Sequence, residues 1–130
     1  MTVGLSAAIA NSMLNAYCRN VSWTQPAAFW AKLHIGDPGA AGTTNAAVET
    51  TRKQATFAAA SAGRCDTSAD MDWTNVAGTE TYSHVSFWTA STAGTFIGSD
   101  VLDTARAVVA GDNVTIEAGT LSLILTPIAA

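Results

Sequence analysis

The residues of this sequence that could bind a metal or transfer a proton are few, and its two histidines come first. His34 and His84 lie in short segments of alternating character, and Asp37 or Asp72 could complete a metal site if those segments were neighbours. These side chains stand far apart in the sequence, and histidines on the faces of strands need no metal to explain them. We therefore predict no metal site.

The stretch "CDTSADMDW" is the second candidate, because it holds Asp66, Asp70 and Asp72. Carboxylates this close could bind Ca²⁺ through oxygen ligands or supply the acid pair of a glycosidase. The stretch lacks the glycine and the distal glutamate of an EF-hand, and no GxSxG, GxxxxGK[ST] or GxGxxG motif occurs in the chain. We predict no catalytic residue and no cofactor, so the protein is not expected to be an enzyme.

Aromatic side chains offer a third kind of site, since Trp and Tyr are enriched at binding surfaces. Trp30 and Trp88 fall on the strand faces that also carry polar residues. The residues predicted to form an interface or ligand surface are Trp30, His34, Tyr82, His84 and Trp88. Trp73 is predicted to lie in the core, and Trp23 between a helix and a sheet.

The elements that must position these residues are one helix and a series of short strands. Leu5, Ile9 and Met13 follow the helical period, which predicts a helix over about 4–18 with Ser6 or Thr2 as its cap. Beyond it, short β-rich segments alternate with turn residues. The strands are expected at 27–35, 52–57, 71–76, 81–90, 94–102, 106–110, 112–118 and 120–125. This pattern predicts a mainly β fold, an antiparallel sandwich or barrel-like domain of about seven or eight strands with one N-terminal α-helix.

The whole chain, 1–130, is expected to form a single domain, with a β-domain over about 27–125 and an apolar C-terminal tail over 126–130. Within it, Asp37, Pro38 and Gly39 end the first strand with turn chemistry: Pro fixes φ, Asp accepts a local hydrogen bond and Gly is free for positive φ. A phosphate cradle would need a helix start directly afterwards, and none follows. The loop over 40–51 is instead expected to be a contact arm.

Composition limits the partners. The chain is 48% hydrophobic but only 12% charged, about half the usual charge, so part of its surface is expected to be covered by other proteins. Its net charge is −4 and its basic residues are scattered, which argues against nucleic acid. No apolar run is long enough for a membrane span, and the N-terminus lacks the pattern of a signal peptide. Cys18 and Cys65 are expected to be buried or half-buried thiols.

The order of segments resembles that of a known family. The helix "LSAAIANSMLNAYC" precedes the strand and turn "AAFWAKLHIGDPG" and the polar strand "TRKQATFAAA". "YSHVSFWTASTAGTFIGSDVL" and "VVAGDNVTIEAGTLSLIL" then complete a match over nearly the whole chain. In this order they resemble a family of small virion proteins of tailed bacteriophages, commonly labelled tail fibre or minor virion proteins. The chain departs from that pattern where Trp88-Thr89-Ala90 replaces an aromatic-Asp-Ala step.

The resemblance implies a non-enzymatic structural protein of the virion, made in the cytoplasm of the bacterial host. Capsid decoration or stabilisation is the favoured role, because a compact domain suits a repeated shell site better than a long fibre. A tail fibre or tail-tip component is the alternative, and a host-glycan-binding adhesin module is the alternative from another class. The expected partners are other copies of the chain, major capsid or tail proteins and host surface glycan, without nucleic acid or membrane.

Overall fold

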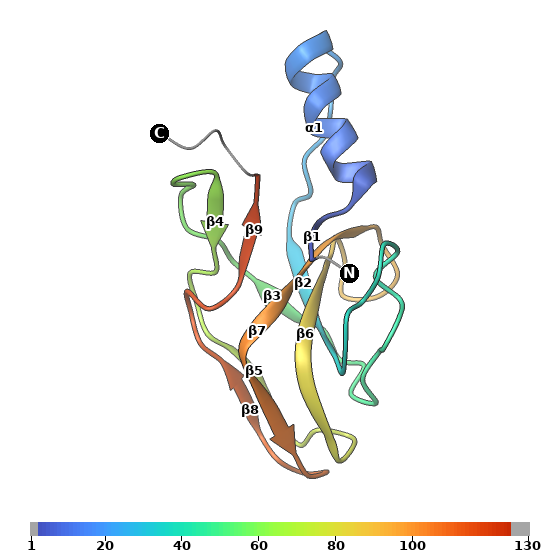
Figure 1. The fold of residues 1–130 in the computed structure, drawn as a ribbon, viewed down its shortest axis with the longest axis vertical. Helices are drawn as coiled ribbons and strands as arrows, with labels where there is room; N and C mark the ends of the chain where they lie inside the picture. Colours follow the sequence, from blue (N-terminus) through green and yellow to red (C-terminus); the bar gives the residue numbers. More distant parts are fainter. Residues whose placement is uncertain (1–2, 126–130) are drawn as a thin grey trace.

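The computed structural model describes residues 3–125, which form one helix and nine strands in antiparallel sheets (Figure 1). The strands are β1 (Gly4–Leu5), β2 (Phe29–His34), β3 (Lys53–Ala55), β4 (Arg64–Asp66), β5 (Met71–Trp73), β6 (Glu80–Trp88), β7 (Phe96–Val108), β8 (Val114–Ile116) and β9 (Ser122–Ile124). Five of them form one sheet in the order β1-β7-β6-β2-β3, while β4–β9 and β5–β8 form two-stranded ribbons. The prediction of a mainly β, sandwich-like fold with one helix is confirmed, and the described strands do not close into a barrel. The predicted apolar tail, 126–130, lies outside the described residues.

The helix α1 (Ala7–Arg19) begins and ends with ordinary capping chemistry. The Ser6 hydroxyl oxygen accepts the N–H of Ile9, and Asn20 closes the other end in the left-handed conformation with φ of 54°. The expected start at residue 4 is wrong, because Gly4 and Leu5 pair with Ser99 and Gly98 of β7. Ile9 is the only buried residue of α1, and the helix projects away from the strands (Figure 1).

The core lies between the five-stranded sheet and the two ribbons. Ala31, Leu33, Val85 and Phe87 of the sheet are fully buried, and Trp73 of β5 lies among them as the sequence predicts. Burying side chains of this size stabilises a fold by roughly 1.5–3 kcal/mol each. This face of the sheet is therefore committed to internal packing.

Apart from strand ends that differ by a few residues and the unpredicted β1, the strands differ from the predicted ones in two places. The segments expected at 94–102 and 106–110 form one continuous strand, β7, which pairs with β6 along both halves. The strand β4 was not expected, because the Ala-rich residues around it carry no alternating pattern. It pairs with β9 and so supplies the second strand of a ribbon.

A break in pairing moves Tyr82 into the core. Tyr82 lies opposite Arg106, whereas His84 lies opposite Val101, so the β6–β7 register shifts between the two residues of β6. The shift interrupts the alternation of faces, and Tyr82 is fully buried with Val85 instead of sharing the face of His84. The prediction that Tyr82 belongs to the candidate surface is therefore wrong.

Two glycines in the left-handed region give a first prediction. At Gly42 (φ 73°) and Gly119 (φ 82°) the backbone conformation would strain any residue other than glycine. An added Cβ at Gly42 would also clash with the ring of Phe96, whereas at Gly119 it would meet nothing within 4 Å. Gly119→Ala should lower the free energy of unfolding by about 1 kcal/mol, through backbone strain alone. Gly42→Ala should lower the free energy of unfolding by ~1–3 kcal/mol more than Gly119→Ala does, because the added methyl group overpacks the site. Urea unfolding of both variants measures the difference, and equal losses would contradict the packing of residue 42 on Phe96.

Candidate interaction surfaces

The pairing of β2 with β6 brings most of the predicted site residues onto one face of the sheet. Trp30 lies opposite Trp88, and His34 lies opposite His84. Because residues directly opposite each other point to the same side, these four side chains share the face turned away from the core. Alternation in the sequence placed Trp30 with His34 on one strand and His84 with Trp88 on another, and the pairing of β2 with β6 joins the two sets.

Half of this face is closed by the chain itself. The covering loop (residues 36–47) runs back along β2, where the Ile35 N–H donates to the carbonyl of Asn45 at 2.9 Å and the Ala47 N–H to that of Leu33 at 3.3 Å. His34 is 0% exposed and Trp88 9% exposed, while Trp30 and His84 are half-buried. His34 and Trp88 therefore do not contribute an open surface in this chain.

A line of hydrogen bonds crosses the closed half of the sheet face and fixes the protonation state of His34. The Trp88 Nε1–H donates to the Ser86 hydroxyl oxygen at 2.8 Å, and that oxygen lies 2.7 Å from His34 Nε2. His34 Nδ1 lies 2.9 Å from the carbonyl of Thr44, which only accepts. The satisfied arrangement is a neutral His34 with its proton on Nδ1 and with Nε2 accepting from Ser86. Burial lowers the pKa of His34 below its ordinary value of 6.5, and the bond to Thr44 opposes this in part.

The Asp37-Pro38-Gly39 turn forms as predicted. The Asp37 carboxylate accepts the N–H of Gly39 at 2.7 Å, Gly39 has a φ of 77°, and Pro38 is buried. Asn45 donates to the carbonyl of Asp37 at 3.0 Å and ties the two ends of the loop together. The turn therefore folds the covering loop onto its own sheet, and a contact with a partner through 40–51 stays a prediction.

Two carboxylates that sequence reasoning missed hold the segment after this loop. Glu80 accepts the N–H groups of Val48 and Glu49, and buried Glu49 accepts those of Thr51 and Ala77. Burial and the nearby charges of Glu80 and Glu49 raise the pKa of Tyr82 to about 12. A glutamate followed by Thr in a polar loop carries no sequence signal for this role.

The other half of the face is open and basic. Gln54 of β3 lies opposite Trp30, and Lys32 lies two residues further along β2 on the same side. The Arg52 guanidinium stacks 4.4 Å from the centre of the Trp88 ring and donates to the carbonyls of Ala90 and Ala93. Burial and the charge of Arg52 lower the pKa of Lys32.

The acidic stretch 66–72 uses its carboxylates on separate partners. Asp66 accepts from Arg64 and from Ser122, which lowers the pKa of Asp66, while Asp70 accepts the N–H of Ala118 and Asp72 the hydroxyl of Thr115. Across residues 3–125, no group of three or more His, Cys, Asp or Glu side chains is placed to hold a metal ion.

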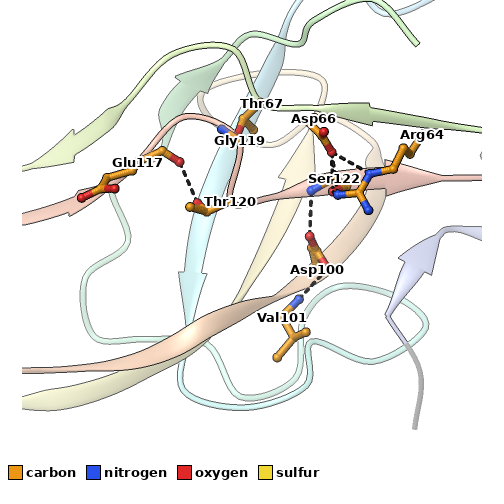
Figure 2. Close-up of polar contacts among 9 residues, drawn as sticks. All are labelled: Arg64, Asp66, Thr67, Asp100, Val101, Glu117, Gly119, Thr120 and Ser122. Carbon is orange, nitrogen blue, oxygen red and sulfur yellow. Dashed lines mark hydrogen bonds and ion pairs between the residues drawn. The ribbon is translucent and has the colours of Figure 1, made fainter. Parts of the chain in front are cut away.

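Asp100 joins the β4–β9 ribbon to the main sheet (Figure 2). One of its oxygens accepts the N–H of Ser122 in β9 at 2.7 Å, and the other accepts the N–H of Val101 at 2.9 Å. Burial raises the pKa of Asp100, although both hydrogen bonds oppose the rise. The ribbon is thus fixed at the end where β9 begins, and the last residues of β9 extend toward α1.

An exposed apolar surface lies where α1 approaches the end of β9. We call it the apolar end; its residues are Met13, Leu14, Tyr17, Ile124 and Leu125. Tyr17 is 92% exposed and Leu14 is 60% exposed. Met13 and Leu125 line both of two grooves here, of about 580 and 310 Å³. Nearby, Cys18 is exposed, which contradicts the expected burial, and Cys65 is half-buried; both are free thiols.

Comparison with known proteins agrees with the resemblance seen in the sequence. Residues 4–124 match the family model described as Podophage GP4 fiber I protein gp80. The chain belongs to this family. No curated protein matches the sequence. Membership of the gp80 family confirms the expectation of a phage virion protein, and it covers the helix, the main sheet and both ribbons. Within residues 3–125, the helix α1 is neither long enough nor apolar enough to cross a membrane.

Burial of His34 in the closed half of the sheet face predicts how the stability of this gp80-family protein depends on pH. The folded state lowers the pKa of His34, so protonation of this residue favours the unfolded chain. The contribution of neutral His34 to the free energy of unfolding is therefore complete above about pH 6.5. It is lost as pH falls below that value, by at most about 1.4 kcal/mol per pH unit. Urea unfolding at about pH 7.5 and about pH 5.5 measures this loss. His34→Gln should reduce the loss, whereas the half-buried control His84→Gln should retain it. An unchanged loss in His34→Gln would show that His34 is not responsible.

Proposed function

We propose that the protein is a non-enzymatic structural subunit of a phage particle and that copies of the chain associate through the apolar end. The observation that carries this proposal is a helix that buries only Ile9 against its own strands while Leu14 and Tyr17 face outward. Membership of a family described as a fiber protein supports the same role. The histidines support it as well, since His34 is closed off and hydrogen-bonded on both ring nitrogens.

A second copy of the chain is the occupant that suits the apolar end. Arg19 is the only charged residue of α1, so two helices can approach without burying a carboxylate. Covering Leu14 or Tyr17 would contribute roughly 1.5–3 kcal/mol per side chain. Self-association also fits the low charge of the chain, because interface cores are depleted in charged residues.

The place of the subunit on the particle is the finer part of the proposal. The sequence alone favours capsid decoration, whereas the family description favours a fibre, which would attach to tail proteins instead of the major capsid protein. We place the fibre first and decoration second. Quantitative mass spectrometry of purified particles separates the two: copies in proportion to tail proteins support the fibre, and copies in proportion to the major capsid protein support decoration.

Self-association through α1 gives a prediction that needs only the purified protein. Leu14→Lys and Tyr17→Lys should convert the oligomer to monomer, because each places a charge in the proposed contact while keeping good helix propensity. Analytical ultracentrifugation measures the mass, and circular dichroism checks that the helix persists.

Val109→Lys is the matched control, because Val109 is likewise an exposed apolar residue but lies after β7, away from α1. This variant should keep the mass of the unmodified protein. A monomeric unmodified chain, or an oligomer that survives Leu14→Lys and Tyr17→Lys together, would overturn association through the apolar end.

A further inference from the structure

The smaller of the two grooves at the apolar end is an apolar hollow that its own chain leaves open. Its volume is about 310 Å³, and Arg64 is the one charged residue among the described residues that line it. The apolar side chains around the groove come from β1, α1, β2, β9 and the segment between β3 and β4, and they are only partly buried. They are Leu5, Met13, Phe29, Phe57 and Leu123. Covering this surface would remove apolar area from water, which favours binding of an apolar group.

The same chain carries an aromatic side chain that is free to enter such a groove. Tyr17 lies in the last turn of α1 and is 92% exposed. It lines the larger groove but not the smaller one, so it does not fill the smaller groove of its own chain. Because α1 projects away from the strands, the Tyr17 ring is held out toward a neighbouring molecule (Figure 1).

We propose that the smaller groove receives Tyr17 of a second copy of the chain. This inference rests on the association proposed above and names the contact through which it forms. A tyrosine suits the groove because its ring is apolar and its hydroxyl group stays at the wet rim. The Nε and Nη2 atoms of Arg64 are bonded to Asp66 and Ser122 (Figure 2), which leaves Nη1 to donate to the phenol oxygen.

Charge favours another copy of this chain as the occupant. Arg19 is the only charged residue of α1 and stands two residues after Tyr17, whereas the chain as a whole has a net charge of −4. The rest of each copy is therefore more acidic than the whole chain. The basic end of α1 is attracted to the acidic body of a neighbour, and no carboxylate of α1 has to be buried on contact.

The two cysteines of the chain mark the two sides of the proposed contact. Cys18 is exposed beside Tyr17, and half-buried Cys65 lines the smaller groove; both are free thiols. A short bismaleimide, added to an equal mixture of isotope-labelled and unlabelled protein, should join Cys18 of one copy to Cys65 of another. Mass spectrometry of the linked peptides identifies links between labelled and unlabelled copies. Cys65→Ser should remove these links and leave the oligomeric mass unchanged.

Filling the groove tests the same contact without a change in α1. Ala60 is exposed and lines the groove, so Ala60→Trp should occupy the space and weaken self-association by about tenfold or more. Ala105→Trp is the matched control, because Ala105 is also an exposed alanine but lines neither groove at the apolar end. Analytical ultracentrifugation measures the association, and circular dichroism checks that both variants stay folded.

Two kinds of failure are distinguishable. Links between Cys18 and Cys18 alone, or an oligomer that Ala60→Trp leaves as stable as Ala105→Trp does, would refute the groove as the site for Tyr17, while association through α1 would stand. A chain that is monomeric before any substitution would refute the association itself and the groove contact with it.

Discussion

The in-register pairing of β2 with β6 is the contact on which the rest of the structure depends. It places Leu33 opposite Val85 on one side and His34 opposite His84 on the other, so a single register fixes both faces. The first face supplies the core that the ribbons cover. The second face holds polar groups that must be satisfied, and the covering loop satisfies them through His34 and Thr44. A one-residue slip would exchange the two faces and bury unpaired histidine in the core.

Carboxylates in this protein mostly hold backbone N–H groups in place and rarely pair with cations. Glu49 and Glu80 fix the segment after the covering loop, and Asp100 fixes the β4–β9 ribbon. A charged acceptor makes a stronger hydrogen bond than a neutral one, so a few acids can order long irregular segments. This use of acids leaves Lys32 and Arg52 without a carboxylate partner among the described residues, and Arg52 instead donates to backbone carbonyls and stacks on Trp88.

Much of the fold follows from local patterns, whereas burial of the site does not. Alternation predicted the shared face of Trp30 and Trp88, and turn chemistry predicted the bend at Asp37. The covering loop has no periodic pattern, so nothing in its residues predicts that it buries His34. The register shift that buries Tyr82 arises where β7 has four residues (102–105) between paired positions and β6 has only one, which is a property of the pair of strands that neither sequence segment carries alone.

The helix at the apolar end shows how far this chain alone determines its structure. An isolated helix of 13 residues is marginally stable in water, and α1 gains little from its own strands, because Ile9 is its one buried residue. Its capping by Ser6 and Asn20 fixes where it begins and ends but adds only on the order of 1 kcal/mol at each end. The exposed side chains of Leu14 and Tyr17 therefore hold most of the stabilisation still available to α1. Order in the helix and association between copies should be thermodynamically linked, because whatever covers this surface binds the helical form alone.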